Sequence, residues 1–180
     1  MALSEATKKE IDAALRRYPE RRTAVLDALR AAQREKGYLG SETILAVAEI
    51  VGLDANALHS LMTFYDLFYD QPVGQHVVMI CRGISCYLRG ADDLIQYLTE
   101  RLGVPTGGTT ADGRITIRTM ECLASCTGAP AMILASRQSE QPADGGESSF
   151  HVNERYIENL TREKLDQILS DLAAAVPAAG

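Results

Sequence analysis

The sequence predicts an α+β protein in which a small N-terminal four-helix bundle is followed by an α/β domain. Residues 4–65 carry apolar side chains at helical spacing, in segments joined by short links. From residue 76 onward, strand-like runs alternate with helical ones. The turn Gln71-Pro-Val-Gly74 separates the two patterns and marks the boundary. We therefore expect domains at residues 1–70 and 71–180.

Length and composition are those of an ordinary globular protein, with 180 residues, 46% hydrophobic and 23% charged. The net charge of -6 argues against a nucleic-acid partner, which usually requires a basic surface. We find no run of about 18 apolar residues, and the first residues lack the apolar centre of a signal peptide. The sequence therefore predicts a cytoplasmic protein without direct membrane insertion, in which cysteines stay reduced.

The helices of the first domain are predicted from their end signals as well as from their periodicity. Ser4 and Asp54 are expected to cap the first and the fourth helix, and Gly37 and Gly52 to end the second and the third. The second helix is expected to begin near residue 20. Thr63-Phe-Tyr65, at the end of the fourth helix, could face a partner, but its periodicity favours packing in the core.

The second domain is predicted to begin with a strand, a helix and a second strand. Strands are expected at residues 76–80, 115–120 and 131–135, and a helix at residues 88–102. Because a helix joins the first two strands, we expect them to be parallel with a right-handed crossover. Residues 150–152 and 156–157 resume a strand, and Thr161 caps a last helix. The polar segment 137–149 is interpreted as a flexible insertion.

All four cysteines lie in two short motifs, each of which follows a predicted strand. The motifs are Cys81-Arg-Gly-Ile-Ser-Cys86 and Cys122-Leu-Ala-Ser-Cys126, and 35 residues separate them. Loops at the ends of neighbouring strands can bring four thiolates together. The pattern therefore predicts a metal site.

Three kinds of chemistry are compatible with these cysteines. Zinc takes four thiolates, usually from pairs two to four residues apart, and this pattern lies at the edge of that range. Thiol–disulfide oxidoreductases usually carry a closer Cys-x2-Cys pair. A [2Fe–2S] cluster needs two thiolates for each iron atom and suits longer loops within a pair. Spacing alone favours the cluster over zinc and places a disulfide framework last.

Together with these motifs, longer stretches of sequence carry a family resemblance. They are Cys-x4-Cys-x35-Cys-x3-Cys, Glu121-Cys-Leu-Ala-Ser-Cys126-Thr-Gly-Ala-Pro130, and more weakly Gln71-Pro-Val-Gly-Gln-His76 and Asn159-Leu-Thr161. Over residues 5–172 the chain resembles the thioredoxin-like [2Fe–2S] ferredoxin family found in respiratory complex I, the E-type subunits of NADH-quinone oxidoreductase. The resemblance implies a thioredoxin-like second domain, cluster ligands at Cys81, Cys86, Cys122 and Cys126, and a cis peptide bond before Pro130.

The same resemblance implies a function. The chain would be an electron-transfer subunit of NADH:quinone oxidoreductase, not catalytic alone, whose cluster exchanges an electron with the FMN of an NADH-binding flavoprotein subunit. It would bind other peripheral-arm subunits on the cytoplasmic side of the inner membrane. Related chains serve NAD-linked hydrogenases and formate dehydrogenases, which gives an alternative parent complex. A zinc-stapled adaptor module is the alternative from another class.

Overall fold

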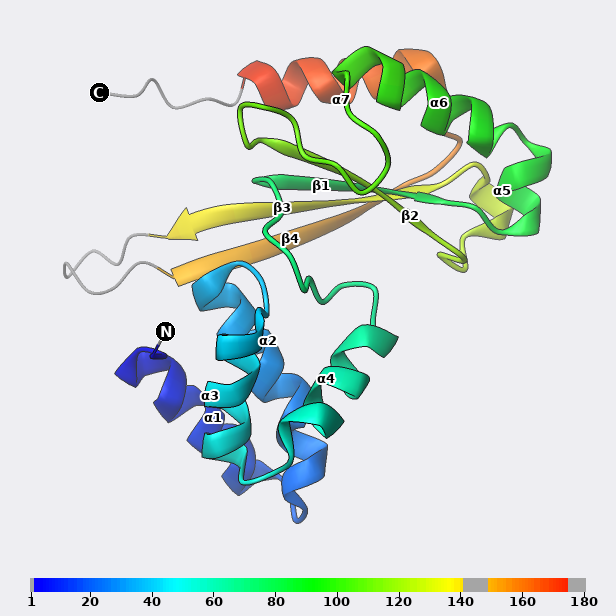
Figure 1. Ribbon diagram of the computed structural model, residues 1–180. Coiled ribbons are helices and arrows are strands. Elements are labelled where there is room, and N and C mark those ends of the chain that lie inside the picture. The colour runs from blue at the N-terminus through cyan, green and yellow to red at the C-terminus, as the bar shows by residue number, and fades with distance from the viewer. Residues whose placement is uncertain (1, 141–148, 175–180) are drawn as a thin grey trace. The chain divides into compact units, whose positions relative to one another are not determined.

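The computed structural model describes residues 2–140 and 149–174, which contain seven α-helices and a four-stranded sheet (Figure 1). The chain divides into two compact units. One comprises Met1–Val73 with Arg137–Val152, and the other Gly74–Ser136 with Asn153–Gly180. The expected mixture of helices with a sheet is confirmed.

Four helices make up most of the first unit. They are α1 (Glu5–Arg17), α2 (Val25–Lys36), α3 (Ser41–Val51) and α4 (Ala55–Phe64). The Ser4 hydroxyl accepts a hydrogen bond from the Thr7 amide at 3.2 Å, and the Asp54 carboxylate accepts bonds at the start of α4. Gly37 and Gly52 end α2 and α3 in the left-handed conformation, at φ +83° and +70°. These predicted ends are confirmed, whereas α2 begins later than expected, after a 3₁₀ turn.

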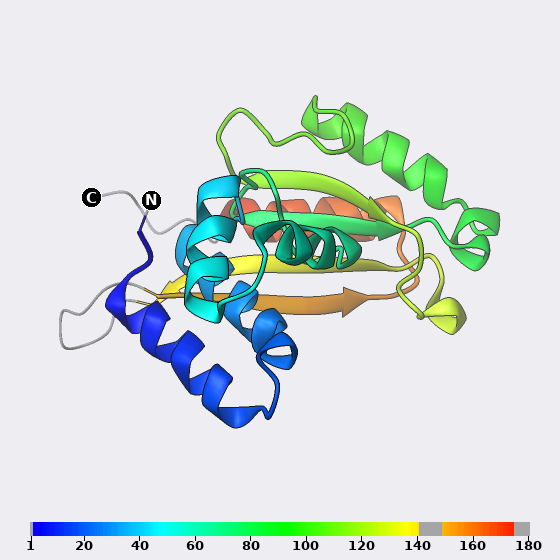
Figure 2. The ribbon, with the colours of Figure 1, turned by 60° about the horizontal axis from the view of Figure 1, so that its bottom comes forward.

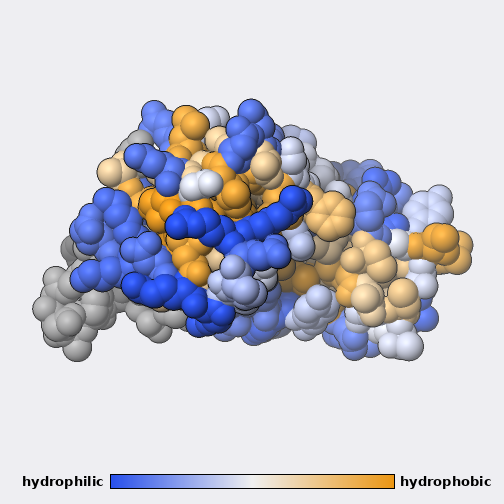
Figure 3. All heavy atoms as spheres, turned by 90° about the horizontal axis from the view of Figure 1, so that it is seen from below, coloured by the Kyte–Doolittle hydropathy of each residue, from blue (hydrophilic) through white to orange (hydrophobic). Residues whose placement is uncertain are grey.

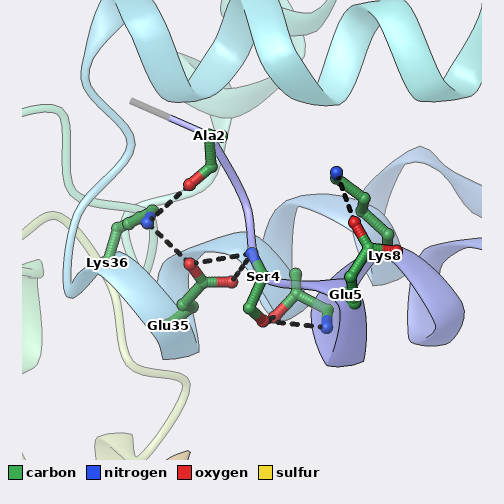
Figure 4. Close-up of polar contacts among 7 residues, drawn as sticks. Ala2, Ser4, Glu5, Lys8, Glu35 and Lys36 are labelled. Atoms are coloured by element: carbon green, nitrogen blue, oxygen red, sulfur yellow. Dashed lines mark hydrogen bonds and ion pairs between the residues drawn. The ribbon is translucent and has the colours of Figure 1, made fainter. Parts of the chain in front are cut away.

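The start of α1 is fixed to the end of α2 by a carboxylate (Figure 4). Glu35 accepts hydrogen bonds from the Ser4 amide at 3.0 and 3.2 Å and pairs with Lys36 at 2.6 Å. Lys36 also donates to the Ala2 carbonyl at 2.9 Å. Burial raises the pKa of Glu35, but hydrogen bonds from Lys36, Thr7 and Ser4 outweigh burial and leave that pKa below its usual value.

Each of the four helices contributes to one hydrophobic core in the first unit. Ile11 of α1, Leu29 of α2, Val47 of α3 and Leu58 of α4 are each at most 1% exposed. A short amphipathic helix is marginal on its own in water, so the shared core stabilises all four.

The end of α4 differs from expectation. Phe64 is 79% exposed, Tyr65 is 39% exposed, and Thr63 is also exposed, so the prediction that this segment packs in the core is wrong. Leu58 and Met62, four residues apart, occupy the inward face of α4. Since each helical residue turns by about 100°, residues 63 and 64 point away from that face.

The sheet has the strand order β2-β1-β3-β4 (Figure 2). Its strands are β1 (His76–Cys81), β2 (Ile115–Met120), β3 (Met132–Glu140) and β4 (Ser149–Ile157). β1 and β2 are parallel, as predicted, and β1 and β3 are antiparallel. All six residues of β1 are buried, which explains the absence of a polar–apolar alternation in its sequence.

Helices α6 (Ala91–Leu102) and α7 (Arg162–Ala174) lie side by side on one face of the sheet (Figure 1). The Tyr97 hydroxyl donates to Asp166 at 2.8 Å, and the Arg162 guanidinium lies 5.1 Å from the centre of the Tyr97 ring. The helix expected at residues 88–102 begins later, as α6 at Ala91, and a separate short helix that was not predicted, α5 (Ile84–Leu88), precedes it. Gly90, at φ +87°, separates them because few other residues adopt that conformation readily.

The segment expected to be a flexible insertion is partly regular. β3 continues to Glu140 and β4 begins at Ser149, so residues 137–140 and 149 belong to strands. Figure 2 shows the two strands running in opposite directions. Residues 141–148 lie outside the described residues.

Hydrophobic side chains also reach the surface, where Figure 3 shows them in orange among hydrophilic ones. The large exposed ones are Leu45, Phe64, Tyr65, Ile84, Tyr87, Leu88 and Tyr156. In the described parts of the chain, no helix by itself has the length and apolar character to cross a membrane. By length and composition alone, only the bent pair of α3 and α4, with 116° between them, meets that requirement.

We predict that His76 makes stability depend on pH. Its Nδ1 lies 2.9 Å from the Ser136 hydroxyl, and burial together with the charge of Arg114 lowers the pKa of His76 from 6.5. As pH falls below the unfolded value, the unfolded chain binds a proton first, so the free energy of unfolding decreases. Urea unfolding of wild type and His76→Gln between about pH 7.5 and 5.5 should show a weaker decline in the variant.

His59→Gln is the matched control, because His59 is exposed on α4. This variant should keep the wild-type pH dependence. Parallel declines for wild type and His76→Gln would contradict the prediction.

Candidate metal centre

The two cysteine motifs begin at the same edge of the sheet. β1 ends at Cys81 and β2 at Met120, and these two residues pair in the parallel register. Parallel neighbours end side by side, so the loops that follow them start next to each other. The Arg82 amide continues this pairing by donating to the Met120 carbonyl at 2.8 Å. The sequence prediction that two adjacent strands present the four cysteines from one edge is therefore consistent with the register.

The first motif turns directly from β1 into α5. The Gly83 amide donates to the Cys81 sulfur at 3.4 Å, and the Gly83 carbonyl accepts from the Tyr87 amide at 2.9 Å. Cys86 therefore lies within the short helix α5. Both sulfur residues are buried, with Cys81 4% and Cys86 2% exposed.

The second motif forms a tighter and more exposed loop. Ala124 adopts φ +57°, which is uncommon for a residue with a Cβ, and its amide donates to the Cys122 sulfur at 3.4 Å. Cys126 then starts a 3₁₀ turn that ends at Gly128. Cys122 and Cys126 are both exposed. The four thiols therefore comprise an inner, buried pair and an outer, exposed pair.

The two loops touch at Gly83. A Cβ at this position would lie 3.0 Å from the Glu121 carbonyl oxygen, 3.5 Å from the Cys81 sulfur and 3.9 Å from the Cys122 Cα. Gly83 has an ordinary φ of -55°, so this position requires glycine for space and not for backbone conformation.

All four cysteines are free thiols, and two of the others affect the pKa of Cys86. Burial raises the pKa of Cys86, a backbone hydrogen bond with Ala131 acts in the opposite direction, and the neighbouring Cys81 and Cys126 raise the pKa further. Cys86 thus lies close to its partner in the first motif and to one thiol of the second motif.

Charged side chains near the loops do not simply neutralise the thiolates. Arg82, next to Cys81, pairs with Asp92 at 3.3 Å, so its positive charge is shared with a carboxylate. Glu121, next to Cys122, is exposed.

A comparison with known families identifies the type of site. The family model described as thioredoxin-like [2Fe–2S] ferredoxin matches residues 11–144. The chain belongs to this family.

Curated members of this thioredoxin-like ferredoxin group resemble the chain over most of its length. The second E-type chain of NADH-quinone oxidoreductase from Rhizobium meliloti is 36% identical over 168 residues, which are 93% of this chain and 89% of the relative. The E-type chain of NADH-quinone oxidoreductase from Pseudomonas aeruginosa is 33% identical over 132 residues, 73% of this chain and 80% of the relative.

A solved structure shares the fold of this chain. A chain in the crystal structure of an air-oxidised NAD+-reducing [NiFe]-hydrogenase superimposes with a TM-score of 0.61 at 17% identity. The match covers 83% of this chain but only 23% of the hydrogenase chain, so it concerns the fold alone.

The cofactor of this ferredoxin family is a [2Fe–2S] cluster, and the donor set fits it. Four free thiols are the ligands that such a cluster requires, and the two amides directed at sulfur are hydrogen bonds of the kind that tune its potential. In the described part of the chain, no three His, Cys, Asp or Glu side chains gather closely enough to hold a single metal ion. A two-iron cluster takes two thiolates at each metal atom, so the four thiols need not surround a single point.

Sequence reasoning missed a second layer around the ferredoxin loops. The segment Glu158-Asn-Leu160 follows β4 and packs on the second cysteine loop. The Asn159 amide donates to the Gly128 carbonyl at 2.6 Å, and the Leu160 amide donates to the Pro130 carbonyl at 2.8 Å. The Ala129–Pro130 bond is cis, as predicted. The motif Asn159-Leu-Thr161 is one of those that carry the family resemblance, but its contact with the loop is visible only in the structure.

We predict that Gly83→Ala weakens the cluster site. The added Cβ would lie only 3.0 Å from the Glu121 carbonyl oxygen, at a cost of about 1–3 kcal/mol unless the two loops separate. The purified variant should retain less iron and acid-labile sulfide than wild type, and should lose its visible absorption at a lower temperature.

Gly40→Ala provides the control, since the nearest atom to a Cβ there, at 3.1 Å, belongs to the Tyr38 ring and not to a cysteine loop. Its iron and sulfide should equal those of wild type. Wild-type iron content and thermal loss in Gly83→Ala would show that the two loops tolerate a side chain.

Proposed function

We propose that the chain is the electron-transfer subunit of an NADH:quinone oxidoreductase, in which it carries one electron at a [2Fe–2S] cluster and is not catalytic alone. The observation that carries this proposal is the register of β1 and β2. Cys81 pairs with Met120, so both cysteine motifs begin at one edge of the sheet. The names of the relatives from Rhizobium meliloti and Pseudomonas aeruginosa support the parent complex.

The proposed ligands are Cys81, Cys86, Cys122 and Cys126. When bound, the cluster supplies a one-electron redox couple. The protein stabilises negative charge on sulfur through the amides of Gly83 and Ala124, which donate to Cys81 and Cys122. Burial of the inner pair excludes water from one side, and exposure of the outer pair leaves the other side open to a redox partner.

A zinc-stapled adaptor accounts for fewer of these observations than an electron-transfer subunit does. Zinc would draw four thiolates around one atom, in tetrahedral geometry. The family is one of [2Fe–2S] ferredoxins, in which four thiolates are shared between two iron atoms. The hydrogenase likeness concerns only the fold, so a diaphorase subunit of an NAD-linked hydrogenase or formate dehydrogenase remains the second choice of parent complex.

The proposed partner is a flavoprotein subunit that binds FMN and NADH, together with other peripheral-arm subunits on the cytoplasmic side of the inner membrane. Exposed apolar side chains on α5 support a protein partner near the cluster. Ile84, Tyr87 and Leu88 are 81%, 58% and 75% exposed on the helix that contains Cys86. Large apolar groups that gather at the surface beside a redox site are typical of docking surfaces. In this proposal the four N-terminal helices act as a bundle that contributes further contacts.

The cluster assignment predicts the behaviour of ligand variants. Cys81→Ser and Cys122→Ser each replace a thiolate that one iron atom requires, so we expect loss of the cluster or a changed EPR signal after reduction. Iron, acid-labile sulfide and EPR spectra of anaerobically purified protein provide the measurement. Wild-type values in both variants would contradict the ligand assignment, and zinc in place of iron in wild type would support the adaptor.

The partner assignment predicts a separate effect on α5. Leu88→Ser should leave the EPR signal unchanged but slow the reduction of the cluster by NADH in the presence of the flavoprotein subunit, because it removes apolar contact area. Leu45→Ser, which changes an exposed leucine of α3, serves as the control. Equal reduction rates for the two variants would exclude this face of α5 from the contact.

A further inference from the structure

A carboxylate with no role in the proposed electron transfer lies against the second cysteine loop. Glu158 follows β4, and its side chain accepts a hydrogen bond from the hydroxyl of Ser125, the residue before Cys126. A side chain at Gly128 would overlap the Glu158 carboxyl group, with one oxygen only 2.6 Å from the added Cβ. The carboxylate therefore lies directly on the loop between Ser125 and Gly128.

The backbone around Glu158 fixes this position from both sides. Asn159, at φ +49°, and Leu160 donate their amides to the carbonyls of Gly128 and Pro130. The Lys164 ammonium binds the Glu158 carbonyl oxygen at 3.0 Å and not its carboxylate. Within the described residues, the ion pairs leave the Glu158 carboxylate without a cation.

The negative charge on Glu158 therefore adds to that of the thiolates. Nearby charges of the same sign repel, and the repulsion grows when the cluster gains an electron. Net charge and hydrogen bonds near an iron–sulfur cluster are among the factors that set its reduction potential. The arginine on the first cysteine loop, Arg82, does not offset this charge directly, because it pairs with Asp92.

From this geometry we infer that Glu158 is a positioning residue that lowers the reduction potential of the cluster by holding a fixed negative charge against the Cys122–Cys126 loop through Ser125. This inference rests on the proposed function. It adds a residue 32 positions beyond the last cysteine to the site. By lowering the potential, Glu158 limits how readily the subunit retains an electron received from its partner.

Glu158→Gln tests the charge without changing the size of the side chain. An amide can still bond to Ser125 and cover Gly128, so the loop should keep its shape. In redox titrations followed by EPR, the midpoint should move to higher potential. At a fixed ambient potential, the ratio of reduced to oxidised cluster should rise by about threefold or more. Because Glu158 is exposed, the difference from wild type should shrink at high salt, which a purely structural change would not produce.

Two further variants complete the experiment. Ser125→Ala releases the carboxylate and should move the midpoint in the same direction by a smaller amount. Glu154→Gln, on an exposed residue of β4, should leave it unchanged. An unchanged midpoint in Glu158→Gln, or a shift of equal size in Glu154→Gln, would overturn the inference.

The failure of the proposed function would look different. Iron and sulfide are measured first, and their absence from wild type would reject the cluster itself. Wild-type iron and sulfide in Glu158→Gln with an unmoved midpoint would reject only the role of Glu158.

Discussion

The site depends on the parallel pairing of β1 with β2. Because His76 pairs with Ile115 and Cys81 with Met120, both strands end at the same level. A slip of one residue would move one cysteine loop along the edge and turn its side chains to the other face of the sheet. β1 is buried along its whole length, so the one-residue slip that would turn its side chains over is strongly disfavoured.

The loops add what the sheet cannot. Gly83 permits a close approach between the two motifs, and backbone amides reach the sulfurs of Cys81 and Cys122. These contacts come from main-chain groups and need only small side chains around them. The Glu158 segment then closes the second loop from outside, so the two motifs are supported in different ways. The first is part of a strand–helix junction, and the second is held by a distant stretch of chain.

Local patterns in the sequence predicted the elements that local forces determine. The strand at residues 115–120 was predicted with the bounds Ile115–Met120, and the caps at Ser4 and Asp54 use side chains that bond to their own helix. The break at Gly90 was missed because Leu94 and Leu98, which carry the helical spacing, both follow it and do not show where the helix begins. Phe64 was misplaced because apolar character does not reveal which face of a helix is covered. Glu158 could not be assigned from sequence, since its contact with Ser125 spans 33 residues and depends on the sheet.

The unequal burial of the thiols has a consequence for the durability of the protein. Molecular oxygen, peroxide and chelators arrive from solvent, so they meet Cys122 and Cys126 before Cys81 and Cys86. Oxidation of the site would therefore start at the second cysteine loop. A chain bound over the second cysteine loop would shield both exposed thiols at once.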